Sequence, residues 1–248
     1  MNETLQTIFA RKSVRAFTER DISPEDKLTI LNAAASSPTA GNQQLYTILD
    51  ITDPALKSRL AETCDHQPFI AEARMILIFC ADCSKWYRAF EMTGCEPRNP
   101  GPGDLLLAVS DANIAAQTAV IAAESLGIGS CYIGDIMENC EEQRKILCLP
   151  QYVFPAAMLV FGYPTDQQKN RVSPGRAPIN RIVSENAYPD TDRQYLEELF
   201  SWKAVAKSYE EWMKAFCERK YNSGFAREMT RSVQEYLNQF NDGEQPDK

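Results

Sequence analysis

Apolar residues near the N-terminus recur at helical spacing. Leu5, Ile8 and Phe9 lie three and four residues apart behind Asn2, a good helix cap, so a first short helix is predicted. Further along, Ser23-Pro24-Glu25-Asp26 combines a cap, a proline for the first turn and two acidic residues. This sequence predicts the start of a second helix.

Three apolar stretches have the length and composition of strands. Two lie over residues 45–51 and 155–161, and the third contains the unbroken run Met75-Ile76-Leu77-Ile78-Phe79, which suits a strand covered on both faces. Asp53-Pro54 predicts the start of a helix between the strand at 45–51 and the strand that contains Met75 to Phe79. Strands and helices alternate irregularly, without the regular crossovers of a doubly wound sheet. The chain is therefore expected to form an α+β layered fold.

A longer helix is predicted from Asp104 to the glycine at 127, and Asn139 is predicted to cap a later one. The long helix is rich in alanine, whose small side chain lets another backbone approach closely. It is therefore expected to be the central helix and a subunit contact. Polar residues interrupt its apolar sequence, which favours a buried helix over a membrane span: Ser110, Asp111, Asn113, Gln117 and Glu124.

The chain beyond Asp190 is predicted to be helical, with aromatic and aliphatic residues on one stripe. Packing on the core and gripping a second subunit explain this stripe equally well. We therefore expect two parts, a main domain over 1–189 and a helical extension over 190–248. The stripe consists of Tyr195, Leu199, Trp202, Tyr209, Trp212 and Phe216.

Composition narrows the classes of function. A formal net charge of −8 argues against general nucleic-acid binding, which needs a basic face. Eight cysteines without a secretory signal indicate reduced thiols and a cytoplasmic protein. Cys80 and Cys83 have the spacing of a dithiol or half a metal site, but no second pair and only one histidine accompany them, so no metal is expected.

Against this acidic background, Arg11-Lys12-Ser13-Val14-Arg15 places three cations and a hydroxyl in five residues. Arginine offers a planar fork of donors that matches phosphate geometry, and serine adds a short donor. A small anionic ligand would explain the cluster. A solvated basic turn after a helix would explain it as well.

Three further segments could belong to the same site. Residues 37–44 combine small residues with amides, residues 127–135 form a glycine-punctuated turn, and Lys169-Asn170-Arg171 adds a second basic point. Each of these alone is more often a plain turn or solvated surface. In the segment before the Gly- and Pro-rich loop 93–103, Trp86, Tyr87 and Phe90 could line a substrate pocket or simply pack as an amphipathic helix.

Taken together, the four segments resemble the nitroreductase-like family of FMN-dependent oxidoreductases, most closely its oxygen-insensitive nitroreductase and flavin reductase branch. The resemblance runs from about residue 5 to Tyr188 and includes 64–69, 79–82 and 184–188. It implies a central, mainly antiparallel sheet flanked by helices. It also implies an interlocked homodimer with two FMN sites at the interface.

The resemblance also implies roles for single residues. The phosphate and ribityl chain would be held by Arg11, Lys12, Ser13, Arg15 and Arg171, with Gln67 near the ribityl or pyrimidine end. A segment contributed across the dimer interface matches Pro38, Thr39, Ala40 and Asn42. The turn against the isoalloxazine matches Tyr132, Ile133, Gly134 and Asp135, with the backbone of Gly134 or Asp135 near flavin N5. Lys169 would lie near the N1–O2 edge.

The implied activity is hydride transfer from NADH or NADPH to FMN, and on to nitroaromatics, quinones or flavins, in a ping-pong cycle that needs no side-chain acid or base. A dedicated flavin reductase and a flavin-binding module with little turnover are the alternatives. The choice of nicotinamide, the physiological acceptor and a lid role for 93–103 are left open. Arg219-Lys220 and Arg227 could bind a 2′-phosphate or be solvated helix ends.

Overall fold

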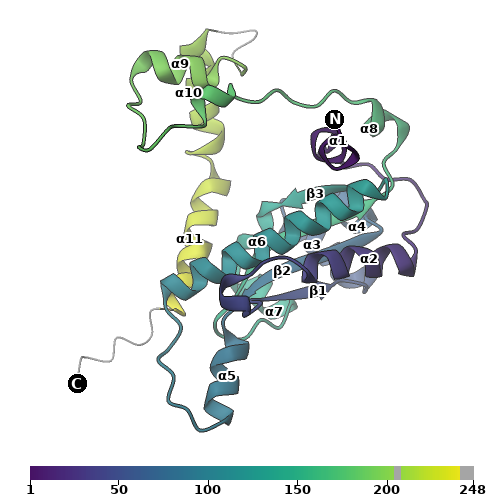
Figure 1. Ribbon diagram of the computed structural model, residues 1–248, viewed down its shortest axis with the longest axis vertical. Helices are drawn as coiled ribbons and strands as arrows, with labels where there is room; N and C mark the ends of the chain where they lie inside the picture. Colours follow the sequence, from purple (N-terminus) through teal and green to yellow (C-terminus); the bar gives the residue numbers. More distant parts are fainter. Residues whose placement is uncertain (204–207, 241–248) are drawn as a thin grey trace. The chain divides into compact units, whose positions relative to one another are not determined.

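The computed structural model describes residues 1–203 and 208–240 of the 248-residue chain. A four-stranded sheet forms its centre (Figure 1), with the strands in the order β1-β2-β4-β3 and every neighbouring pair antiparallel. The strands are β1 (Tyr46–Asp50), β2 (Met75–Asp82), β3 (Gly129–Ile133) and β4 (Val153–Gly162). Every residue of β2 and β4 is buried, because these two strands are central and covered on both faces. The predicted α+β fold with an antiparallel sheet is confirmed.

Helices cover this sheet. α6 packs on β2 and β4, and α2 lies beside it. Within the first compact unit, residues 1–170 with 229–248, the helices are α1 (Glu3–Ala10), α2 (Pro24–Ala35), α3 (Pro54–Thr63), α4 (Pro68–Glu72), α5 (Ser84–Met92), α6 (Pro102–Ser125), α7 (Cys140–Ile146) and α8 (Asp166–Asn170), with the short 3-10 turns η1 (Ala40–Asn42) and η2 (Gly134–Met137).

α6 is the central helix that the sequence predicts, and it begins two residues earlier than Asp104. Its alanines at 108, 112, 115, 116, 119 and 123 are fully buried, so the small side chains bring the helix close to the sheet. Among the described residues it alone is long and apolar enough to cross a membrane by length and composition. Its packing on the sheet is that of a core helix.

The predicted N-cap positions are confirmed at four helices, and three of the four side chains make the capping hydrogen bond. Asn2, Ser23 and Asp53 each accept a backbone N–H of the helix that follows. Asn139 adopts a left-handed conformation and its amide donates to the Thr63 carbonyl at 3.0 Å. The N–H of Cys140 instead donates to the Ser232 hydroxyl at 2.8 Å.

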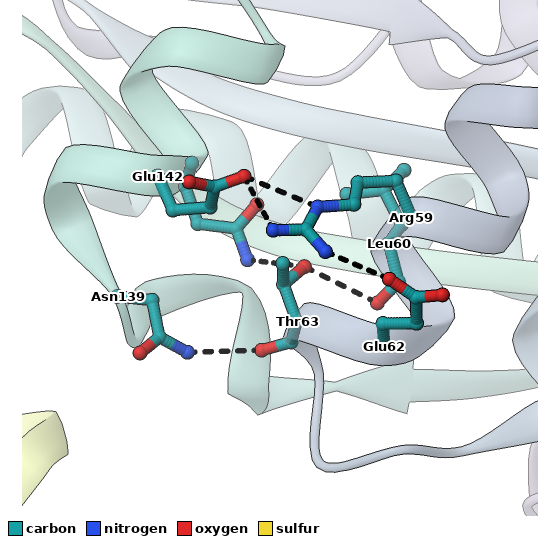
Figure 2. A network of polar contacts seen from close by, with 7 residues as sticks. Arg59, Leu60, Glu62, Thr63, Asn139 and Glu142 are labelled. Atoms are coloured by element: carbon teal, nitrogen blue, oxygen red, sulfur yellow. Dashed lines mark hydrogen bonds and ion pairs between the residues drawn. The ribbon is translucent and has the colours of Figure 1, made fainter.

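A polar network ties α3 to α7 (Figure 2). Arg59 donates from Nη2 to Glu142 at 2.8 Å and from Nη1 to Glu62 at 2.7 Å. Beside it, Asn139 bonds the Thr63 carbonyl. These contacts fix the C-terminal end of α3, where the chain enters the segment 64–67.

The second compact unit covers residues 171–228. It is irregular up to Asp192 apart from the turn η3 (Ile179–Arg181), and then contains α9 (Arg193–Phe200), α10 (Tyr209–Lys220) and the start of α11 (Gly224–Asn238). The single continuous stripe predicted for this region is wrong, because α9 ends at Phe200. Ser208 and Glu211 then form a capping box that starts α10.

The later part of α11 belongs to the first unit. Tyr236 is fully buried and meets the Phe154 ring edge-on at 5.0 Å, and Phe240 packs against Tyr152 at 5.6 Å. The Ser232 hydroxyl that caps α7 also donates to the Met137 carbonyl. Part of the predicted C-terminal extension therefore completes the core of the sheet domain.

Candidate cofactor site

The basic pentapeptide is held along the edge of the sheet. Ser13 pairs with Ser130 of β3 in a parallel bridge, and the Val14 N–H donates to the Ser130 carbonyl at 2.9 Å. Val14 is buried, and a Cβ at position 129 would lie 2.6 Å from its Cγ2, so only glycine fits there. Ser13 and Val14 thus anchor the segment 11–15 to β3 through the backbone, while Arg15 stays exposed.

Lys12 and Lys169 meet in space although 157 residues separate them in sequence. The Lys12 ammonium donates to the Lys169 carbonyl in α8, and the Arg15 N–H donates to Gln168 Oε1 at 3.3 Å. The pentapeptide, α8 and the end of α6 enclose a hollow of about 320 Å³. Its lining is Ala10, Lys12, Val14, Glu124, Gly127, Gly129, Pro164 and Lys169.

The cations of the pentapeptide act on β3 and on α6. Burial raises the pKa of the Cys131 thiol, while the Arg15 charge and a Ser13 hydrogen bond oppose that rise. Burial raises the pKa of Tyr132 to about 12, against the charge of Arg11. Arg11 and Arg15 therefore direct positive potential at the same end of β3, where a phosphate would be stabilised.

One carboxylate stands beside these cations. Burial raises the pKa of Glu124, near the end of α6, and the charges of Arg11 and Lys12 act against the rise. Lys169 is exposed and pairs with Asp166 at 3.0 Å. The sequence predicted Lys169 for this region, but it gave no signal for Glu124.

The turn after β3 leaves its backbone accessible. Gly134 is exposed, and no atom lies within 4 Å of the position a Cβ would take. Tyr132 is exposed to 37% and donates from its hydroxyl to Gln117 Oε1 at 3.2 Å. A flat ring could therefore approach the backbone of Gly134 and Asp135 without meeting a side chain at Gly134, which fits the role that the resemblance implies.

Gln67 follows two residues, Asp65 and His66, with positive φ of 60° and 50°. Its amide donates to the Cys64 carbonyl at 2.9 Å. Burial raises the pKa of Cys64 to about 12, and the carboxylate of Asp135 adds to the rise. The Gln67 segment and the turn after β3 are therefore neighbours.

The segment 37–44 depends on a buried carboxylate. Asp111, 2% exposed in the middle of α6, accepts the N–H of Ala40 at 2.9 Å and that of Leu45 at 3.2 Å. Between them the backbone takes positive φ at Gly41, Asn42 and Gln44. Pro38 and Asn42 remain exposed. Sequence reasoning missed this role, since it took Asp111 only as a polar interruption of an apolar helix.

The structure thus gathers most of the predicted residues into two places. The first place is β3 and the turn after it, with Gln67 near that turn. It contains Arg11, Lys12, Ser13, Arg15, Lys169, Tyr132, Ile133, Gly134, Asp135 and Gln67. Pro38, Thr39, Ala40 and Asn42 lie in the loop held by Asp111. Arg171 begins the second unit, and its predicted role is untested.

Cys80 and Cys83, which have the spacing of a dithiol, are both buried. Burial raises the pKa of both Cys80 and Cys83 to about 12, with Asp82 adding to both and Asp104 to Cys83. Both groups are neutral thiols near pH 7, which makes them poor nucleophiles.

Known proteins resemble most of the chain. A sequence model of the Nitroreductase family matches residues 8–163. An FMN reductase [NAD(P)H] of Bacillus subtilis is 31% identical over 95% of this chain and 91% of its own length. An oxygen-insensitive NADPH nitroreductase of Salmonella typhimurium is 33% identical over 79% of each chain.

Solved structures agree with these relatives. NfrA2 of B. megaterium superposes with a TM-score of 0.82 at 28% identity, covering 95% of this chain and 98% of that one. The NADPH:FMN oxidoreductase of Vibrio harveyi complexed with NAD+ gives 0.76 at 26% identity, over 96% and 98%. This chain belongs to the nitroreductase family.

Proposed function

We propose that this protein is an FMN-dependent oxidoreductase that takes hydride from NADH or NADPH and passes it to nitroaromatics, quinones or flavins. The observation that carries the proposal is the pairing of the cationic segment 11–15 with β3, which ends at the accessible turn of Gly134. Relatives named FMN reductase and NADPH-flavin oxidoreductase support it.

Within this proposal, Arg11, Ser13 and Arg15 hold the FMN phosphate, with Lys12 beside them. Arg171 is assigned to the same phosphate as a further cation. Gly134 and Asp135 would offer their backbone to the ring system, and Lys169 would stabilise negative charge on the reduced flavin. Bound there, FMN supplies the hydride-accepting centre, and the chain supplies orientation and charge.

The functional unit is a homodimer. The loop 38–42 is held at Asp111, and the cationic end of the site lies near Glu124. These two positions are thirteen residues apart in sequence, which is about 20 Å along α6. A second copy supplies the loop from across the interface. Apolar residues exposed on α1 and α6 suit such an interface: Leu5, Ile8, Phe9, Leu106 and Ile114.

We place the protein in the cytoplasm. All eight cysteines are free, and a reducing compartment keeps thiols in that state. We infer that residues 1–189 carry the FMN site and that residues 190–248 are a helical extension of this domain.

The test is a visible absorption spectrum of the purified protein, before and after anaerobic addition of NADH or NADPH. A flavin spectrum that bleaches within seconds with either nucleotide supports the proposal and identifies the donor. Flavin that is retained but not bleached points to a flavin-binding module. A protein that neither carries nor takes up FMN contradicts the proposal.

A further inference from the structure

The segment that carries Gln67 begins where α3 ends, and its backbone is unusual. Asp65 and His66 both take positive φ, of 60° and 50°. The N–H of Gln67 then donates back to the Ala61 carbonyl at 2.9 Å. Two successive residues with positive φ, neither of them glycine, persist only where the surrounding structure fixes them. The position of Gln67 therefore depends on how firmly the end of α3 is held.

The end of α3 is held by side chains of α7. Gln143 is fully buried, and its Nε2 donates to Thr63 Oγ1 at 3.0 Å and to Cys64 Sγ at 3.9 Å. Beside it, Asn139 Nδ2 donates to the Thr63 carbonyl at 3.0 Å (Figure 2). The carbonyls of a last helical turn have no partner within their own helix. One of those of α3 is thus satisfied from α7, just before the segment of Gln67.

α7 is in turn fixed to the turn that follows β3. Ser232 of α11, which is fully buried, accepts the Cys140 N–H at 2.8 Å and donates to the Met137 carbonyl at 2.7 Å. These two bonds span the junction between η2 and α7. On the side of α3, burial raises the pKa of the Cys64 thiol to about 12, and the carboxylate of Asp135 adds to the rise. The end of α3 and the turn after β3 are therefore parts of one connected structure.

The chemistry of Gln143 indicates a role beyond packing. Its Oε1 is buried and accepts no hydrogen bond from any residue that the structure describes. A buried acceptor without a partner costs stability, and a leucine of similar size would not carry that cost. Core packing alone therefore does not favour glutamine at this position. What the glutamine provides is the donor to Thr63 and Cys64.

We propose that Gln143 is a positioning residue of the flavin site, whose amide holds the end of α3 so that Gln67 meets the bound FMN. The inference rests on the proposed function for the presence of FMN, and it deepens that function. Gln143 is fully buried and acts through Thr63 and Cys64. Without its bonds the Gln67 amide would have to be ordered when FMN binds, which lowers the affinity.

Hydrogen exchange of the flavin-free protein tests the hold on this segment directly. Gln143→Leu removes the donor and nearly keeps the volume, and amide exchange over residues 64–67 should become about tenfold faster. Glu142→Gln is the matched control, because Glu142 is the next residue of α7 and also bonds α3, at Arg59. It should leave exchange over 64–67 unchanged. Unchanged exchange in Gln143→Leu overturns the inference.

Fluorescence titration with FMN tests whether Gln143 acts through Gln67. Gln67→Ala should weaken FMN binding about tenfold and Gln143→Leu about fivefold. In the Gln67→Ala background, Gln143→Leu should change the affinity by less than about twofold, because the group that it positions is gone. A general loss of stability would lower the affinity in both backgrounds alike. A full fivefold loss in the Gln67→Ala background therefore overturns the inference.

Thr63 provides a conservative variant for the same bond. Thr63→Ser keeps the hydroxyl that accepts from Gln143, and its FMN affinity should stay within about twofold of the native value. Thr63→Val keeps the shape and loses the hydroxyl, so it should weaken FMN binding as much as Gln143→Leu does. Equal affinities of Thr63→Ser and Thr63→Val would contradict a role for this hydrogen bond.

Failure of the proposed function gives a different result. If the native protein holds FMN and the Gln143 and Gln67 effects are coupled, but NADH and NADPH do not bleach the flavin, the role of Gln143 stands and the enzymatic role falls. If the nucleotides bleach the flavin but Gln143→Leu leaves exchange over 64–67 unchanged, only the inference on Gln143 falls. A native protein that takes up no FMN overturns both.

Discussion

The two halves of the proposed FMN site are built on different physical principles. The cationic segment 11–15 is paired with a strand through its backbone, and its position rests on main-chain bonds and on the contact between Val14 and Gly129. The loop 37–44 has positive φ at three residues and is held by one buried carboxylate, that of Asp111. The first half should tolerate loss of individual side chains, whereas the second depends on one.

The largest effect is expected from breaking the loop. Asp111→Ala leaves the half-buried N–H of Ala40 and the buried N–H of Leu45 without their acceptor, which should lower the free energy of unfolding by roughly 3 kcal/mol. Urea denaturation measures it. Ser110→Ala is the matched control on α6, because its hydroxyl bonds only the Leu106 carbonyl of the same helix. A loss below 1 kcal/mol for Asp111→Ala would show that the carboxylate does not hold the loop.

The segment 11–15 should be displaced from β3 when a side chain is introduced at Gly129. Gly129→Ala places a methyl group against Val14, and forcing it in should cost about 2 kcal/mol and weaken FMN binding. Gly103→Ala is the control, because no atom lies within 4 Å of the position that its Cβ would take. This change should cause no loss of stability and no loss of FMN affinity.

Val14→Ala tests the cause of that loss. In the double variant Gly129→Ala/Val14→Ala the contacts with the two γ-carbons of Val14 are gone and only its Cβ remains close, at 2.9 Å, so the two changes should cost about 1 kcal/mol less than their sum. Strictly additive losses would mean that Gly129 and Val14 do not contact each other as described.

A smaller effect is expected from changing the charge beside the cationic segment 11–15. Glu124→Gln removes a carboxylate beside Arg11 and Lys12, so FMN should bind about threefold more tightly at pH 7. Because burial raises the pKa of Glu124, the native carboxylate is neutralised as pH falls through this raised value. The advantage of the variant is therefore present at pH 7 and lost in acid, as FMN titrations at several pH values would show. A pH-independent advantage would contradict the role of this charge.

The sequence anticipated the elements that carry the site because their signals are local. The caps of α1 and α2, the apolar run of β2 and the glycine after α6 each depend on a few neighbouring residues. The basic pentapeptide was found for the same reason. What it pairs with became visible only in the sheet, since Ser130 lies far along the chain.

The residues that sequence reasoning missed act over long separations. Asp111 bonds N–H groups 71 and 66 residues away, and no local pattern distinguishes it from any polar residue on a core helix. Ser232 caps α7 from 92 residues away, in place of the neighbouring Asn139. The end of α9 was missed although Ser208 and Glu211 carried a local capping signal, because the apolar spacing continued across it.

The central claim is that the cations of segment 11–15, with Arg171, hold the phosphate of FMN. Fluorescence titration of the flavin-free protein with FMN and with riboflavin, which lacks the phosphate, tests it most directly. We predict that the native protein binds FMN about 100-fold more tightly than riboflavin, and that Arg11→Ala/Arg171→Ala reduces this ratio below about tenfold. Equal affinities in the native protein, or a ratio that survives the double substitution, would contradict the account.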